Sequence, residues 1–244
     1  MQLTKIPRAI LRRSQRKIYS AFRIDALTFK KFSSRDDLVE IGSHQGGWVV
    51  PVNMLNSDSI CYLAGCGTDI TFDLALIERF GCDVHAFDPT PRAIEHVQSK
   101  TVGNSKYHFQ EVGIWDKEDT LEFFVPANPN HISHSLVNLQ KTAESIRVKV
   151  KRLSSLMKEL GHQKIDLLKI DIEGAEYKVL ESVIEDQIDV RVLCVEFDEY
   201  AHPLDKDYKS RIRSHVNALL EYGFELANSD HSGNYTFVKS QPAT

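Results

Sequence analysis

Two pairs of carboxylates stand where apolar stretches of the sequence end. Asp171 and Glu173 follow the run at 165–170, and Glu196 and Asp198 close a second run. Because alternate residues of an extended segment share a side, we expect each pair to point the same way. If the two runs are neighbouring parallel strands, the four carboxylates converge, and like-charge repulsion raises some of their pKa values. A raised pKa suits a general base, so these acids are candidates for proton removal.

Other interpretations of these four carboxylates stay open. Oxygen-only sites suit Mg²⁺, so a magnesium ion held by several of them is possible. Spacing alone does not define a metal site, however, and we expect none. The acids could instead turn the chain or pair with Lys and Arg. His134, with His131 and Ser135, is a further candidate for a base or a substrate contact, although a polar surface loop is the commoner explanation for such residues.

A second constellation consists of two glycines followed at a distance by an acid. Gly65 and Gly67 stand between a strand-like run and a helical stretch, where backbone without Cβ atoms can approach a nucleotide closely. Asp88 ends the next strand, 21 residues past Gly67, where a carboxylate can accept hydrogen bonds from ribose hydroxyls. An Asp-Pro turn would explain Asp88 structurally, but its spacing to the glycines favours a nucleotide site.

The charge around the glycine loop indicates the kind of nucleotide. The loop and the start of its helix carry Asp69 and Asp73 and neither Arg nor Lys, an environment that repels phosphates. A dinucleotide fingerprint would also need a third glycine at Ile70. A sulfonium with an α-ammonium, as in S-adenosylmethionine, would be favoured there. The pattern therefore predicts S-adenosylmethionine rather than NAD as the cofactor.

The elements that must position these residues alternate along the chain from residue 58 onward. Strands are expected at 60–64, 83–87, 106–112, 165–170, 190–197, 224–227 and 235–238, and helices at 69–80, 91–100, 153–160, 175–184 and 208–222. Such alternation predicts an α/β protein with a doubly wound, mostly parallel seven-stranded sheet. The last two strands should form an antiparallel hairpin.

Two segments depart from this alternation. Residues 1–57 form an N-terminal extension with a basic helix and the turn His44-Gln-Gly-Gly-Trp48. The turn could fold over the cofactor, shape the acceptor pocket, or anchor the extension through its tryptophan. Residues 58–244 form one domain with an insertion at about 113–164, a usual position for a substrate-binding surface.

Charge and cysteine content limit the setting and the partners. The net charge is -4, yet the first 31 residues hold nine Lys or Arg and one acid, so the rest of the chain is strongly acidic. An acidic body argues against nucleic-acid binding. The basic segment could dock on an anionic membrane or a partner protein, or pack on its own acidic body. Without a CxxC pair, a membrane-spanning run or a signal peptide, a soluble cytoplasmic protein is expected, or one at the membrane periphery.

Four blocks of sequence resemble the FkbM-type methyltransferases, a branch of the class I S-adenosylmethionine-dependent enzymes. The blocks are 62–67, 84–91, 164–176 and 194–199; they occur in family order, and 164–176 is the most specific. The resemblance spans roughly residues 40–238 and implies a Rossmann-like methyltransferase that O-methylates a hydroxyl of a sugar, saccharide or related small metabolite. N- or carboxyl-methylation and a non-catalytic binding module of the same fold are the alternatives.

Two positions depart from the pattern of this fold. Leu63 stands where an acid usually precedes the loop, and Asp69 stands where a third glycine is frequent. We interpret Asp69 as taking over part of the missing acid's role, near the methionine ammonium. The resemblance places the adenine beside the residues after the third strand, with Asp116 as a partner for its amine and Trp115 either in contact or ordinary core. These residues are Gly113, Ile114, Trp115 and Asp116.

Overall fold

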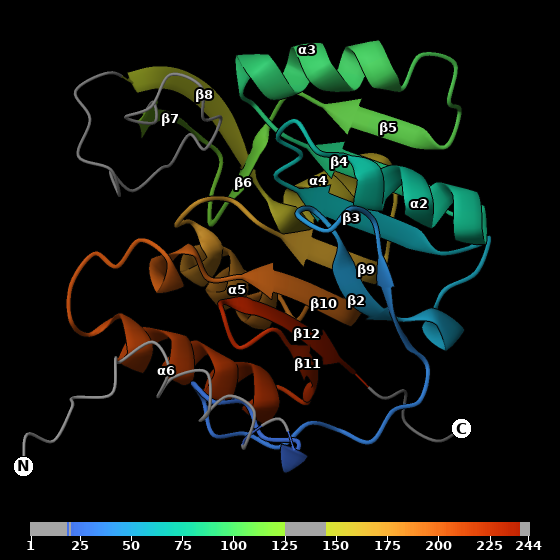
Figure 1. Cartoon of the computed structure of the whole chain (residues 1–244). Helices are drawn as coiled ribbons and strands as arrows, with labels where there is room; N and C mark the ends of the chain where they lie inside the picture. The colour runs from blue at the N-terminus through green and yellow to red at the C-terminus, as the bar shows by residue number, and fades with distance from the viewer. Residues whose placement is uncertain (1–18, 20, 125–144, 240–244) are drawn as a thin grey trace, which may run out of the picture.

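The computed structural model describes residues 19, 21–124 and 145–239. At its centre is a seven-stranded sheet in the order β11-β12-β10-β9-β3-β4-β5 (Figure 1). The strands are β3 (Ile60–Ala64), β4 (Asp83–Phe87), β5 (Tyr107–Gln110), β9 (Ile165–Ile170), β10 (Val190–Glu196), β11 (Glu225–Ser229) and β12 (Asn234–Val238). β12 is antiparallel to both of its neighbours, and the pairings from β10 across to β5 are parallel. The predicted doubly wound fold and its closing hairpin are confirmed.

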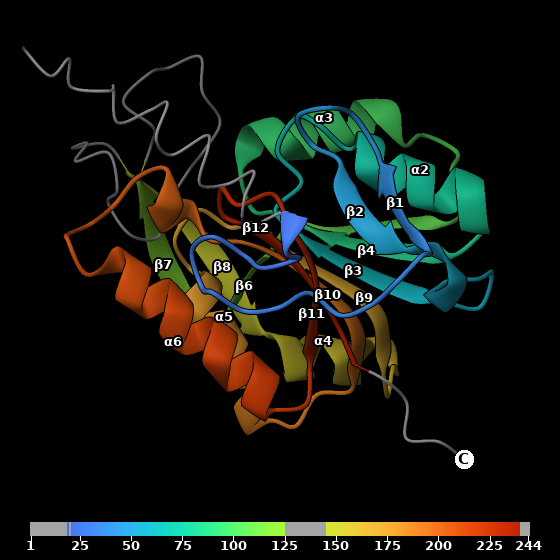
Figure 2. The same cartoon turned by 60° about the horizontal axis from the view of Figure 1, so that its bottom comes forward.

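Helices cover both faces of the sheet. α2 (Thr71–Phe80) and α3 (Pro91–Lys100) lie on one face, and α4 (Leu153–Leu160), α5 (Glu176–Glu185) and α6 (Tyr208–Glu221) lie on the other (Figure 2). Because both faces are covered, the central strands are apolar at consecutive positions rather than at alternate ones. Tyr62 and Leu63, adjacent in β3, are both fully buried in different apolar clusters.

An N-terminal hairpin completes the α2–α3 face. β1 (Leu38–Ile41) pairs antiparallel with β2 (Trp48–Pro51), and a short 3-10 helix, η1 (Val52–Met54), follows. Trp48 and Val50 are buried in the same apolar cluster as Leu63. The Thr236 hydroxyl of β12 donates a 2.7 Å hydrogen bond to the Val49 carbonyl. The hairpin is therefore fixed on the central sheet, and Leu63 is apolar because it belongs to this packed face.

A three-stranded sheet in the order β6-β8-β7 lies at the upper left of Figure 1. It contains β6 (Gly113–Trp115), β7 (Asp119–Phe124) and β8 (Ser145–Arg152). Arg152, at the end of β8, forms an ion pair with Asp186 after α5 and also donates to the Asp116 carbonyl. The sheet is thereby tied to the helix layer behind it.

One predicted strand is wrong in its extent. The strand expected at 106–112 ends at Gln110 as β5, because the Val112 amide donates to the Gln110 carbonyl and turns the chain there, and β6 begins at Gly113. β6 then leaves the central sheet and pairs with β8. The basic helix expected near the N-terminus falls largely in residues 1–18 and 20, outside the described residues. No helix of the described ranges is long and apolar enough to cross a bilayer.

Candidate active site

A cavity of about 340 Å³ opens at the carboxyl ends of β3, β4 and β9. Its wall combines the glycine loop, the β4–α3 turn, β6 and β7, the loop after β9, and the tip of the N-terminal hairpin. The residues that line it include Gln45, Gly46, Gly65, Gly67, Asp69, Asp88, Pro89, Thr90, Gly113, Ile114, Phe123, Lys169, Asp171, Ile172 and Glu173. In open α/β sheets, ligands bind at this edge, so the cavity is the candidate site.

The glycine loop can be this tight only because position 65 lacks a side chain. Gly65 has a φ of +82°, and a Cβ there would lie 1.7 Å from the carbonyl oxygen of Asp171. Its amide donates a 3.0 Å hydrogen bond to the Phe87 carbonyl at the end of β4. The loop is therefore held between two strand ends, with its backbone facing the cavity.

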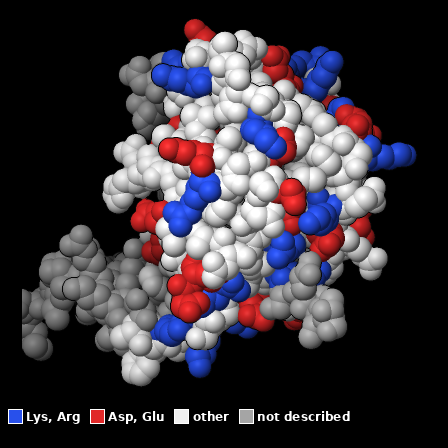
Figure 3. All heavy atoms as spheres, turned by 90° about the vertical axis from the view of Figure 1, so that its right-hand side faces the viewer, with Lys and Arg blue, Asp and Glu red and all other residues white. Residues whose placement is uncertain are grey.

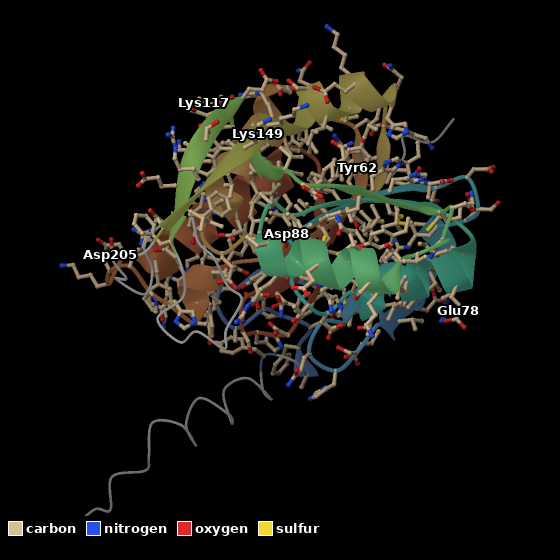
Figure 4. The ribbon with its side chains drawn as sticks, turned by 90° about the horizontal axis from the view of Figure 1, so that it is seen from above. Tyr62, Glu78, Asp88, Lys117, Lys149 and Asp205 are labelled. Carbon is tan, nitrogen blue, oxygen red and sulfur yellow. The ribbon has the colours of Figure 1, made fainter. Side chains whose placement is uncertain are left out.

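Asp88 fixes the other side of this loop. One carboxylate oxygen accepts hydrogen bonds from the Cys66 and Gly67 amides at 2.9 and 3.0 Å. The other oxygen accepts from the amide and hydroxyl of Thr90 at 2.9 and 2.6 Å. Asp88 lies where α3 begins, as its label in Figure 4 shows. It lines the cavity as expected, but its acceptor positions already hold protein donors, so the ribose contact stays a prediction.

A buried lysine stands beneath the loop. The Lys169 ammonium donates 2.8 Å to the Gly65 carbonyl and lies 2.9 Å from the Asp171 carboxylate. Burial alone would lower the pKa of Lys169, but the charges of Asp171 and Asp73 hold it above its ordinary value. The sequence signal for Lys169 was a cation inside a strand that is apolar apart from Asp166 and Lys169 itself. Its role had not been predicted.

Asp73, in the first turn of α2, is a second charged residue beneath the glycine loop, beside Lys169. Its side chain is buried and accepts a 2.8 Å hydrogen bond from the Tyr107 hydroxyl. Burial raises the pKa of Asp73 to about 6, and the Lys169 charge opposes that rise. Asp73 does not line the cavity. It therefore supplies negative charge to the loop from below rather than to a ligand.

The expected alternation of Asp171 and Glu173 is wrong, because β9 ends at Ile170. Glu173 has a φ of +53° and Gly174 a φ of +100°, so the chain leaves the extended conformation immediately. Both carboxylates nevertheless line the cavity, with Ile172 between them. A left-handed backbone at a non-glycine residue costs free energy, and such residues are concentrated at functional sites. Glu173 is therefore a candidate functional residue.

Glu196 and Asp198 do not repeat the geometry of the first pair. β10 ends at Glu196, Asp198 begins the 3-10 helix η2 (Asp198–Tyr200), and neither residue lines the cavity. Burial, reinforced by the charges of Asp171 and Glu173, raises the pKa of Glu196 to about 8. The predicted convergence of like charges is therefore present, although only two of the four acids face the cavity.

A buried pair of acids lies behind this cluster. Burial raises the pKa of Glu176 to about 7, and burial together with the charge of Glu176 raises the pKa of Asp198 well above its usual range. Glu176 also accepts a 2.8 Å hydrogen bond from the Gly174 amide, which steadies the loop after β9. Within the described ranges, no three His, Cys, Asp or Glu side chains are arranged to hold a metal ion.

The opposite end of the cavity is apolar. Pro89, Ile114 and Phe123 line it together with Gly113, where a Cβ would come within 3.5 Å of Phe123. Gly113 and Ile114 thus line the cavity, and their contact with the adenine stays a prediction. Trp115 and Asp116 do not line the cavity; Trp115 packs instead against the apolar cluster of β7 and β8.

Phe123 was missed by sequence reasoning. It reaches the cavity because β7 pairs with β8 and lies over the β4–α3 turn, and its local sequence signal is only that of an ordinary strand. The other candidates of the insertion, His131, His134 and Ser135, lie outside the described residues.

Asp69 lines the cavity at its polar end. Burial would raise the pKa of its carboxyl, but hydrogen bonds from Ser43 and Thr71 outweigh that effect and lower it. The carboxylate is therefore held ionised in a fixed position.

A glycine loop after the first parallel strand, an acid ending the second, and a crevice at the carboxyl edge define a nucleotide-binding protein of the Rossmann-like class.

Within that class, the chain belongs to the FkbM methyltransferase domain family, whose sequence profile matches residues 64–226. "Probable methyltransferase-like protein 24" of Rattus norvegicus is 30% identical over 141 residues, which cover 58% of this chain and 32% of that protein. "Methyltransferase sdnD" of Sordaria araneosa is 38% identical over 94 residues, covering 34% of this chain and 33% of that protein. The chain thus spans about a third of the length of these relatives.

Solved structures with a similar fold share little sequence with this chain. The fibrillarin pre-rRNA processing protein of Methanococcus jannaschii is 11% identical, with a TM-score of 0.45 over 87% of this chain and 86% of that one. The Podospora anserina methyltransferase PaMTH1, solved with S-adenosylhomocysteine bound, is 8% identical, with a TM-score of 0.44 over 75% and 72% of the two chains.

Proposed function

We propose that this chain binds S-adenosylmethionine in the cavity and methylates a hydroxyl of a saccharide or related small metabolite. The charge of the cavity carries the proposal. Asp69, Asp88, Asp171 and Glu173 line it, and the ammonium of Lys169, which also lines it, is already paired. A positively charged sulfur nucleoside is favoured there, and phosphates are not. Membership in the FkbM methyltransferase family supports methyl transfer as the reaction.

The shape of the cavity suits the two ends of this cofactor. Its volume of about 340 Å³ lies in the range of small-molecule pockets. The apolar end between Ile114 and Phe123 suits the adenine, and the fixed carboxylate of Asp69 suits the α-ammonium. Between them, Asp88 and Thr90 stand at the position expected for the ribose. When bound, S-adenosylmethionine supplies an electrophilic methyl group on positively charged sulfur.

Glu173 is our candidate for the general base. It lines the cavity, and its left-handed backbone is a strained conformation of the kind that is concentrated at functional sites. Asp171 is less suited, because its carboxylate is paired with Lys169. We assign Asp171 to positioning and Glu173 to removal of the acceptor's proton, a contribution worth roughly 10²- to 10⁴-fold in rate. His134 stays the alternative base.

A small acceptor is proposed rather than a nucleic acid. On the face shown in Figure 3, basic and acidic side chains are interspersed and form no continuous basic stripe among the residues drawn in colour. Nucleic-acid binding depends on clustered positive charge. The saccharide hydroxyl itself comes from the family resemblance. The basic segment before residue 19 is proposed to contact a membrane surface or a partner protein.

The cofactor is tested first by calorimetry with S-adenosylmethionine, S-adenosylhomocysteine and NAD. We expect binding of the two sulfur nucleosides and none of NAD. Absence of binding by either sulfur nucleoside at millimolar concentration would overturn the proposal. Transfer of a labelled methyl group into a cell extract, with the product identified by mass spectrometry, then tests the acceptor class. Label found on nucleic acid, or on nitrogen or carboxyl groups, contradicts the assignment.

The base is tested by Glu173→Gln. We expect S-adenosylhomocysteine to bind as before and methyl transfer to fall about 100-fold or more. Glu159→Gln is the matched control, because Glu159 is an exposed acid of α4 that pairs with Lys151 and does not line the cavity. Equal activity of the two variants would remove Glu173 from the chemistry.

A further inference from the structure

The tip of the N-terminal hairpin forms part of the cavity wall, although it precedes the residues that the family profile matches. Gln45 and Gly46 line the cavity, whereas the profile begins at residue 64. The hairpin is anchored to the central sheet, because Trp48 is buried and the Val49 carbonyl accepts a hydrogen bond from Thr236 of β12. Figure 2 shows β1 and β2 beside α2, the helix that follows the glycine loop. A fixed element thus closes the polar end of the site.

A set of hydrogen bonds joins this tip to the glycine loop. The Ser43 hydroxyl donates 2.6 Å to one carboxylate oxygen of Asp69 and accepts from the Gly46 amide at 2.8 Å. The Ser43 amide donates 2.9 Å to the Thr71 hydroxyl. Thr71 in turn donates to the second carboxylate oxygen of Asp69 through its amide and its hydroxyl, at 3.0 and 2.6 Å. The orientation of Asp69 is therefore set jointly by the hairpin and by α2.

The close approach of the two segments depends on glycine. A Cβ at Gly46 would lie 2.8 Å from the carboxyl carbon of Asp69. That carboxylate cannot simply swing aside, because it would lose the hydrogen bonds from Ser43 and Thr71. Any larger residue at position 46 therefore moves either the hairpin tip or Asp69.

The α-carboxylate of the cofactor also needs a hydrogen-bond partner at the polar end of the cavity. Its α-ammonium matches Asp69, but its α-carboxylate must be accommodated in a cavity lined by several acids. The cation among the described lining residues, Lys169, is already bound to Asp171 and to the Gly65 carbonyl. Gln45 lines the cavity, and no hydrogen bond joins its side-chain amide to another part of the described chain. A neutral amide donor can hold a carboxylate without the repulsion that a further acid would bring.

We propose that three residues of the hairpin tip, Ser43, Gln45 and Gly46, form the recognition element for the amino-acid end of the cofactor. Gln45 donates its side-chain amide to the α-carboxylate, and Ser43 holds Asp69 to accept from the α-ammonium. The inference rests on the proposed function, since it names the residues that bind one end of that cofactor. It also extends the cofactor site into the N-terminal extension, beyond the matched family domain.

The test compares two ligands that share a nucleoside. S-adenosylhomocysteine carries the amino-acid end, and 5′-methylthioadenosine lacks it. We expect Gln45→Ala to weaken S-adenosylhomocysteine about tenfold in calorimetry and to leave 5′-methylthioadenosine unchanged. Ser43→Ala and Gly46→Ala should behave in the same way. His44→Ala is the matched control, because His44 is an exposed neighbour that does not line the cavity.

The outcomes separate this inference from the proposed function. If S-adenosylhomocysteine binds the unaltered chain and Gln45→Ala binds it equally well, the inference is overturned and the proposed function stands. If Gln45→Ala weakens both ligands equally, the tip only shapes the cavity and the inference is again overturned. If the unaltered chain binds neither ligand, the proposed function itself fails. Thermal unfolding of each variant confirms that binding is measured on folded protein, and Gln45, being exposed, is the substitution least able to disturb the fold.

Discussion

The ammonium of Lys169 donates a 2.8 Å hydrogen bond to the carbonyl of Gly65, so a charged group of β9 holds the backbone of the glycine loop. The same ammonium pairs with Asp171. Burial would lower the pKa of Lys169, but the charges of Asp171 and Asp73 raise it above its ordinary value. Two features of the site thus depend on one buried cation: the conformation of the glycine loop and the tolerance of the buried acid Asp73 in α2.

Lys169→Met should therefore destabilise the fold strongly. It leaves the carboxylates of Asp73 and Asp171 without their cation, and breaking a buried pair in this way costs about 3 kcal/mol or more. Urea unfolding measures the loss. Lys106→Met is the control, because Lys106 pairs with Asp83 where both side chains are partly exposed. A loss for Lys169→Met no larger than for the control would show that the buried network contributes little.

Gly65→Ala and Gly161→Ala separate two roles of glycine. Both residues have a positive φ, +82° and +75°, so each substitution costs about 1 kcal/mol or more in backbone strain. At Gly161 nothing lies within 4 Å of the added Cβ, whereas at Gly65 the Asp171 carbonyl oxygen lies 1.7 Å away. Gly65→Ala must therefore push β3 and β9 apart as well. We expect it to abolish S-adenosylhomocysteine binding and to lower stability far more than Gly161→Ala, as calorimetry and urea unfolding would show. Similar losses for the two variants would contradict the close approach.

The sequence predicted the central sheet well because its strands are buried on both faces. The run Ile165–Ile170 is apolar apart from Asp166 and Lys169, and such a run is typical of a strand covered on both faces. Asp88 was found for a related reason, since the carboxyl end of the second strand has a fixed place relative to the glycine loop. These features depend on local pattern and on short, regular connections.

What the sequence did not reveal depends on contacts between distant segments. Phe123 enters the cavity because β7 pairs with β8 across residues outside the described part of the chain. Trp115 was expected either at the adenine or as ordinary core, and its ring packs against the apolar cluster of β7 and β8 because β6 pairs with β8. Glu173 was placed by strand alternation, which fails once the backbone becomes left-handed.

Glu196 should make stability fall as the pH rises. Burial and neighbouring charges raise its pKa from 4.5 to about 8 in the folded protein, so the folded state binds a proton that the unfolded state has released. Its contribution is complete below pH 4.5 and is lost as the pH rises through 8. Glu196→Gln removes this ionisation and should flatten the decline in melting temperature between pH 5 and about 9.

A residual decline is expected in that variant, because burial also raises the pKa of Glu176 and Asp73, to about 7 and about 6. Glu159→Gln, at an exposed acid, should leave the pH dependence as it is. Parallel curves for Glu196→Gln and the unaltered chain would show that Glu196 does not change its protonation on folding.

His85 should have the opposite effect, at acid pH. Its ring is 7% exposed, stacks on His108 with centroids 4.6 Å apart, and meets His162 edge-on at 4.7 Å. Tyr62 packs beside it, and the Asp83 carboxylate is hydrogen-bonded to His108. Burial, helped by the charges of the two neighbouring histidines and opposed by Asp83, lowers the pKa of His85 from 6.5 to about 4.

Between pH 6.5 and 4, His85 is therefore protonated in the unfolded chain and neutral in the folded protein. Stability is lost as the pH falls through this window, because the unfolded state binds the additional proton. The loss amounts to at most about 3 kcal/mol. His85→Phe keeps an aromatic ring in the stack and cannot take up the proton, so its unfolding free energy should decline less between pH 6.5 and 4, as urea titrations at several pH values would measure. His202→Gln, at an exposed histidine, should follow the unaltered chain. If His85→Phe follows it as well, the acid sensitivity in this window comes from other groups, of which His162, whose pKa is also lowered by burial, is one.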